Sequence, residues 1–147
     1  MPMSTREMFA RLINCEAGGE GLTGMQAVAT AIMNRVHVAY GEYLRVCQGN
    51  LRFVMEQPYQ YTCMMETVGG EYNPQNIWNT PAEAIHFEVA DWALAGNKLS
   101  DVDDALWYMN PFSPDCPPFF PYNRSGVIFN RIGEHCFYIP TSLYAQT

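Results

Sequence analysis

Residues 12–21 read Leu-Ile-Asn-Cys-Glu-Ala-Gly-Gly-Glu-Gly, and in this stretch a helical pattern gives way to glycines. On a helix, Glu16 shares one face with Phe9, Leu12 and Ile13, which precede it by seven, four and three positions. Glu16 therefore ends an apolar stripe, where its carboxylate is partly desolvated and lies at the negative end of the helix dipole. Both effects raise the pKa of a carboxyl group.

A carboxylic acid that is still protonated near neutral pH is what a general acid for glycosidic bond cleavage requires. The alternative interpretation is a glutamate that simply ends a surface helix. Such cleavage often uses a second carboxylate, and Glu20 is the nearest one. The glycines at 18 and 19 leave its spacing from Glu16 open, so Glu20 is either that second carboxylate or a residue that orders the turn or caps the next helix.

Capping patterns predict three helices. Ser4 with Glu7 begins the first, which the glycines stop after residue 17. Thr23 with Gln26 begins the second, which runs to about residue 37. Thr80, followed by a proline, begins a third that ends before residue 96. A shorter helix is expected around residues 51–57.

The second half of the chain carries β-rich segments at residues 105–109, 127–132 and 135–139. The last two flank Gly133-Glu134 and predict a hairpin. Glycine, asparagine and proline predict loops over residues 65–80 and 110–126. The predicted fold class is α+β, a mainly helical domain with a small β-hairpin or sheet.

Composition limits what this domain does. A chain of 147 residues suits one domain, which we expect to span residues 1–147. The net charge of −7 argues against nucleic acid as a partner. No apolar run is long enough to span a membrane. Charged side chains interrupt residues 1–14, so we expect no signal peptide.

The five cysteines are an odd number, so at least one thiol stays free or pairs between molecules. No Cys-x-x-Cys occurs, and a structural zinc site is therefore not expected. His135 beside Cys136 suggests a thiol–imidazole pair at first sight. Neighbours on a strand point to opposite faces, however, which argues against it.

Several segments in order resemble the cell-wall hydrolases of the SleB/CwlJ type, the spore cortex-lytic enzymes. Residues 10–21 resemble that family's glutamate signature, and residues 24–36 resemble the segment that follows it. Further resemblances lie at residues 57–62, 106–111, 115–118 and 133–138. The last two segments are closer to the CwlJ branch, and a disulfide between their cysteines, Cys116 and Cys136, is one possible pairing.

This resemblance implies a lysozyme-like fold, similar to that of lytic transglycosylases, and peptidoglycan of the spore cortex or cell wall as substrate. It implies cleavage between N-acetylmuramic acid and N-acetylglucosamine, with Glu16 as the catalytic acid and base and with no cofactor. A role in sporulation or germination and a spore-coat protein partner would accompany it. A water-using muramidase or glucosaminidase, with Glu20 as second carboxylate, and a non-catalytic wall-binding or coat protein are the alternatives.

Supporting residues are expected around Glu16. The amide of Gln60 beside the ring of Tyr61 suits an N-acetyl group. Tyr108 and Tyr138 are candidates for hydrogen bonds to the sugar, although core packing is the alternative for both. The substrate-binding prediction therefore comprises Glu20, Gln60, Tyr61, Tyr108 and Tyr138. Asn34 and Arg35, near the end of the second helix, are expected to be structural, with the guanidinium holding carbonyls or a carboxylate.

Overall fold

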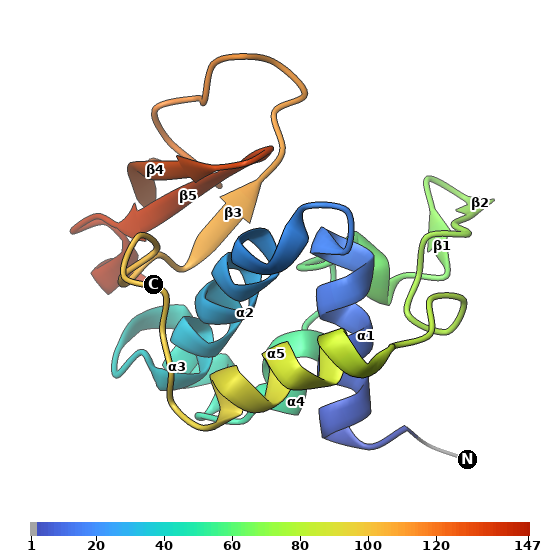
Figure 1. Cartoon of the computed structure of the whole chain (residues 1–147). Helices are drawn as coiled ribbons and strands as arrows, with labels where there is room; N and C mark the ends of the chain where they lie inside the picture. The colour runs from blue at the N-terminus through green and yellow to red at the C-terminus, as the bar shows by residue number, and fades with distance from the viewer. Residues whose placement is uncertain (1–2) are drawn as a thin grey trace.

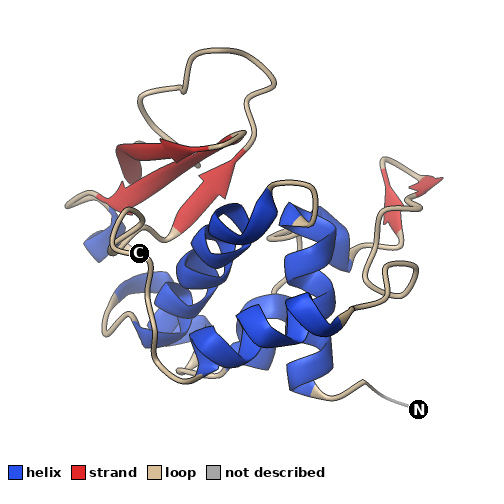
Figure 2. Cartoon of the chain, in the orientation of Figure 1, coloured by secondary structure: helices blue, strands red, loops and turns tan. Residues whose placement is uncertain are grey.

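The computed structural model describes residues 3–147, which form a helical body with a three-stranded sheet on one side and a short hairpin on the other (Figures 1 and 2). The helices are α1 (Thr5–Ala17), α2 (Gly21–His37), α3 (Gly41–Cys47), α4 (Leu51–Glu56) and α5 (Ala84–Leu94), with short 3-10 turns η1 (Thr62–Met64) and η2 (Tyr144–Gln146). The strands are β1 (Thr67–Val68), β2 (Glu71–Tyr72), β3 (Trp107–Met109), β4 (Gly126–Ile132) and β5 (His135–Pro140). The predicted α+β class, mainly helical with a small sheet, is confirmed.

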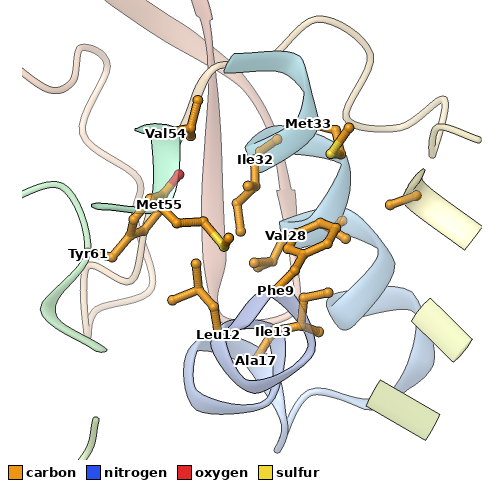
Figure 3. Close-up of a cluster of buried hydrophobic side chains, with 14 of the residues drawn as sticks. Phe9, Leu12, Ile13, Ala17, Val28, Ile32, Met33, Val54, Met55 and Tyr61 are labelled. Carbon is orange, nitrogen blue, oxygen red and sulfur yellow. The ribbon is translucent and has the colours of Figure 1, made fainter. Parts of the chain in front are cut away.

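The apolar stripe predicted on the first helix forms the centre of the core (Figure 3). Phe9, Leu12 and Ile13 are fully buried, and Val28 and Ile32 of α2 are buried in the same cluster. Truncating a buried phenylalanine of this kind to alanine costs about 3–5 kcal/mol. The stripe therefore fixes the end of α1, and with it Glu16, against the rest of the fold.

α1 begins as predicted, because the Ser4 hydroxyl accepts a hydrogen bond from the backbone nitrogen of Glu7 at 3.1 Å. The predicted start of the second helix is wrong. α2 begins at Gly21 with Glu20 as its N-cap residue, so Thr23 lies inside the helix. The Glu20 side chain makes no capping bond, because it reaches a distant turn described below.

The predicted start of the third helix is wrong as well. α5 begins at Ala84 rather than near Thr80, and Glu83 and His86 form its capping box. The backbone nitrogen of Glu83 donates to Nδ1 of His86 at 2.9 Å. Upstream, the carbonyl of Pro81 accepts from the Asn14 amide at 2.8 Å, which ties this segment to α1 instead of to a helical turn. Two elements are absent from the sequence predictions. They are the helix α3 and the hairpin β1–β2, and the hairpin lies inside the loop predicted over residues 65–80.

The predicted hairpin is confirmed: β4 and β5 are antiparallel neighbours, and β3 completes the sheet in the order β3-β5-β4. Gly133 has a φ of 59°, which a glycine at the turn adopts without strain. The loop between β3 and β4 is fastened to β5 by a disulfide between Cys116 and Cys136, which confirms that pairing. Within residues 3–147, no helix is both long and apolar enough to cross a membrane.

Candidate active site

A cavity of about 580 Å³ lies where the C-terminal end of α1 meets the start of α2. One wall comes from the segments around η1 and after β2, and the other from β3, the loop after it and the β4–β5 turn. Figure 1 shows these two groups of segments on opposite sides of the α1–α2 junction. The volume suits one or two sugar units, so a longer glycan would extend beyond it.

Glu16 lines this cavity from the last turn of α1 and is only partly exposed. Burial raises the pKa of its carboxyl group to about 7, and the positive charge of Arg35 opposes that shift. Among residues 3–147 the carboxyl has neither a hydrogen bond nor an ion pair, so no described residue competes with a ligand for it. A carboxyl in this state can donate a proton at neutral pH and accept one afterwards.

Arg35 also lines the cavity, and it is buried without an ion pair in the described part of the chain. Its Nε donates to the carbonyl of Leu106 at 2.6 Å, and its Nη1 donates to Oε1 of Gln60 at 3.3 Å. Its guanidinium carbon lies 4.9 Å from the ring centroid of Tyr61. The carbonyl contact agrees with the structural role expected for Arg35, and the buried charge also acts on Glu16.

The hydroxyls of Tyr61 and Tyr108 are buried and find no hydrogen-bond partner within residues 3–147. Both residues line the cavity, and their ring centroids are 6.4 Å apart. Burial raises the pKa of each hydroxyl, so both are neutral and can donate a hydrogen bond. An unpaired buried hydroxyl is unfavourable, and a bound sugar is one partner that would satisfy it.

Glu20 lines the same cavity, but its carboxylate is engaged by the β4–β5 turn. Oε1 accepts from the backbone nitrogen of Glu134 at 2.6 Å, and Oε2 contacts Nδ1 of His135. The contact is close enough that a Cβ added at Gly133 would lie 2.7 Å from Oε1. Glu20 thus orders a turn that is distant in sequence, whereas the prediction concerned the local turn or the cap of the next helix.

The structure brings five of the six predicted site residues to one cavity: Glu16, Glu20, Gln60, Tyr61 and Tyr108. The sixth, Tyr138, does not line it. Tyr138 is buried in the sheet, and its hydroxyl donates to the carbonyl of Pro117 at 2.8 Å. Tyr138 pairs with Trp107 across β3 and β5, whereas Tyr108 pairs with Phe137, so the two tyrosines face opposite sides of the sheet.

Gln60 reaches the cavity with its amide oxygen already engaged. Oε1 accepts from Arg35 and from the hydroxyl of Tyr43, the latter at 2.9 Å. These two bonds orient the amide and leave its NH₂ group as the donor that a carbonyl of an N-acetyl group could meet.

Sequence reasoning missed several residues of the cavity. A disulfide joins Cys15, beside Glu16, to Cys63 of the opposite segment, with their Cα atoms 6.1 Å apart. His135 and Phe112 also line the cavity. The place of His135 depends on which face of the sheet the helices cover, and the place of Phe112 depends on the course of the loop after β3. The sequence carries no direct signal of either. The remaining cysteine, Cys47, is buried and free.

No group of three histidine, cysteine, aspartate or glutamate side chains in the described part of the chain could hold a metal ion. The chemical groups that do converge are a carboxyl with a pKa of about 7, a buried guanidinium and two unpartnered phenols. This arrangement suits proton transfer to and from a bound sugar.

Known proteins share both this sequence and this fold. The family model for Cell Wall Hydrolase matches residues 19–138. Cell wall hydrolase CwlJ of Bacillus subtilis (strain 168) is 29% identical over 136 residues, which cover 92% of this chain and 85% of that protein. CwlJ of Oceanobacillus iheyensis is 27% identical over 136 residues, with 92% and 86% covered.

Among solved structures, the catalytic domain of the germination-specific lytic transglycosylase SleB from Bacillus anthracis superposes with a TM-score of 0.65 at 23% identity. The alignment covers 94% of this chain and 96% of that domain. The likeness shows a common lysozyme-like fold. Since the family model matches most of its length, the chain belongs to the cell wall hydrolase family.

Proposed function

We propose that this protein cleaves the glycan strands of peptidoglycan between N-acetylmuramic acid and N-acetylglucosamine, with Glu16 as the catalytic acid and base. One observation carries the proposal. Glu16 lines the cavity, the pKa of its carboxyl group is about 7, and that group has no hydrogen-bond or ion-pair partner among residues 3–147. A non-catalytic wall-binding or coat protein has no need of such a carboxyl. The membership in the cell wall hydrolase family supports the substrate.

We further propose that Glu16 works alone, as in a lytic transglycosylase. Its carboxyl proton passes to the glycosidic oxygen as the bond to C1 of the muramic acid breaks. The resulting carboxylate takes the proton of the C6 hydroxyl of the same sugar, and that oxygen bonds to C1. The products are a 1,6-anhydro end and a free hydroxyl on the leaving sugar. Neither water nor a cofactor enters the reaction.

The contacts of Glu20 favour this reading. Both of its oxygens are engaged, one by the backbone of Glu134 and one by His135, which leaves Glu20 poorly placed to activate water. The alternative is a hydrolytic muramidase or glucosaminidase in which Glu20 is the second carboxylate. That alternative retains support from the position of Glu20 in the same cavity.

The remaining site residues have binding roles in the proposal. The hydroxyls of Tyr61 and Tyr108 donate to the sugar or to the reacting oxygens, and the Gln60 amide donates to an N-acetyl carbonyl. Residues 1–147 act as one catalytic domain. We propose the spore cortex or the cell wall as the place of action, because the CwlJ relative is a cell wall hydrolase and the SleB relative is germination-specific. A spore-coat protein as partner is part of the proposal through the family resemblance alone.

Mass spectrometry of the products of purified peptidoglycan tests the proposal. Digestion in ¹⁸O-labelled water should yield 1,6-anhydromuramic ends that carry no label. Labelled reducing ends in high yield would replace the transglycosylase reading with the hydrolytic one. An absence of any glycan fragments from intact cortex and vegetative peptidoglycan would contradict the proposal altogether.

A further inference from the structure

Two aromatic side chains beside the cavity combine high exposure with an unusual backbone. Phe112 is 88% exposed and Tyr59 is 85% exposed, more than any other large apolar side chain among residues 3–147. Phe112 has a φ of 51° and Tyr59 a φ of 63°. Bulky residues rarely adopt this left-handed conformation, which is unfavourable for them and concentrates at functional sites.

Tyr59 occupies a turn position that favours another residue. The turn runs from Gln57 to Gln60, whose backbone nitrogen donates to the carbonyl of Gln57 at 3.3 Å. Pro58 at the second position and a positive φ at the third are typical of a turn that places glycine or asparagine there. A tyrosine held there is therefore projected into solvent at an energetic penalty.

The surface beside Tyr59 is hollowed. A second cavity of about 190 Å³ is lined by Tyr59, Trp78 and Tyr61, and Tyr61 also lines the cavity that holds Glu16. Tyr61 therefore forms a wall common to both cavities. Trp78 is itself 49% exposed, so this area presents a second aromatic ring.

Phe112 projects from the other wall, on a loop that is well fixed. Its backbone nitrogen donates to Oδ1 of Asn110 at 2.8 Å. Nη1 of Arg131 donates to the carbonyl of Pro114 at 2.8 Å, and the Cys116–Cys136 disulfide fastens the loop to β5. The ring thus stays exposed because ordered backbone holds it there, and it lines the cavity of Glu16 directly.

We propose that Phe112 and Tyr59 are stacking platforms for sugar rings of the glycan strand that lie at the edge of the cavity of Glu16 or beyond it. This inference rests on the proposed function for its ligand. A pyranose presents an apolar face of C–H groups, which an aromatic ring covers with release of water. The cavity accommodates only part of a polymer, so the strand requires contacts beyond it, and these two rings meet it on either wall.

Binding without cleavage gives the most direct test. In a Glu16→Gln background, Phe112→Asn and Tyr59→Asn remove each ring while keeping a residue that tolerates the left-handed backbone. Each should raise the Kd for purified glycan strands about fivefold, because the apolar contact with roughly one ring face is lost. The melting temperatures should stay equal or rise, because the backbone strain is relieved.

Phe53→Ala is the matched control, since Phe53 is 51% exposed on α4 and lines neither the cavity of Glu16 nor the cavity beside Tyr59. It should leave the Kd unchanged. If Phe112→Asn and Tyr59→Asn bind like Phe53→Ala, the stacking proposal is overturned.

Cleavage by the active enzyme separates this inference from the proposed function. Both asparagine variants should raise KM for long strands with kcat within about twofold. Tyr59→Asn, whose ring does not line the cavity of Glu16, should act like the wild type on a disaccharide that fills only that cavity. If the wild type cleaves long strands and the variants have the same KM, the stacking proposal is wrong and the proposed cleavage activity is retained. If the wild type cleaves neither substrate, the proposed function fails, and the binding measurement still decides on the platforms.

Discussion

Glu20 and Glu134 are joined by a hydrogen bond of 2.6 Å, from the backbone nitrogen of Glu134 to Oε1 of Glu20. The bond links the start of α2 to the β4–β5 turn across 114 positions of sequence. The same carboxylate contacts His135. One side chain therefore fixes the sheet against the helices beside the cavity, and the wall that carries Tyr108 depends on it.

Replacing Glu20 separates this positioning role from a catalytic one. Glu20→Gln keeps one acceptor for Glu134 but loses the negative charge beside His135. The free energy of unfolding should fall by about 1–3 kcal/mol, as for a disturbed buried polar contact. Turnover on peptidoglycan should stay within about tenfold of wild type, with an unchanged product. A loss of about 10²–10⁴-fold at unchanged stability would instead identify Glu20 as a base.

The pKa of Glu16 predicts a pH dependence of catalysis. Since that pKa is about 7 in the folded protein, kcat/KM should decline as pH rises through this value and the general acid loses its proton. A profile measured from pH 5 to 9 checks it. A flat alkaline limb across this range would show that Glu16 is not the group whose protonation matters.

Stability should follow the same titration. The folded pKa of Glu16 is raised from 4.5 to about 7, so its favourable contribution is complete below about pH 4.5 and is lost as pH rises to about 7. By this linkage the wild type should lose about 3 kcal/mol over that window relative to Glu16→Gln, which does not titrate. Denaturant unfolding at several pH values measures the difference. Parallel curves for the two proteins would contradict a buried carboxyl.

The disulfide between Cys15 and Cys63 closes a loop of 48 positions and holds Glu16 opposite Tyr61. The double variant Cys15→Ser, Cys63→Ser should lose about 4 kcal/mol of stability in the chain-entropy description, together with most of its activity. Cys47→Ser is the control, because Cys47 is a buried free thiol and its replacement leaves both disulfides intact. Thermal unfolding and turnover measure both effects. Full activity of the double variant would show that the disulfide does not position Glu16.

Removing the unpartnered hydroxyls of Tyr61 and Tyr108 should change stability and activity in opposite directions. Tyr61→Phe and Tyr108→Phe remove buried hydroxyls that no described residue satisfies, so the melting temperature should hold or rise. If the hydroxyls donate to the sugar, kcat/KM should fall by about tenfold for each. Loss of stability with unchanged kcat/KM would assign both residues to the core.

Local patterns predicted those features that depend on neighbours in sequence. The stripe of α1 gives Glu16 its burial, and Gly133 gives the hairpin its turn, so both were predictable. The start of α2 was not, because Glu20 satisfies a backbone donor more than a hundred positions away instead of capping its own helix. The different positions of Tyr108, which lines the cavity, and Tyr138, which does not, could not be predicted either, because strand register alone sets which tyrosine faces the cavity.

The central claim is that Glu16 transfers the proton in glycan cleavage, and one variant tests it most directly. Glu16→Gln is nearly isosteric and should retain the fold, but an amide cannot donate the proton. Release of soluble fragments from purified peptidoglycan, measured with matched concentrations of folded protein, should fall at least about 10²–10⁴-fold. Turnover near that of the wild type would contradict the account.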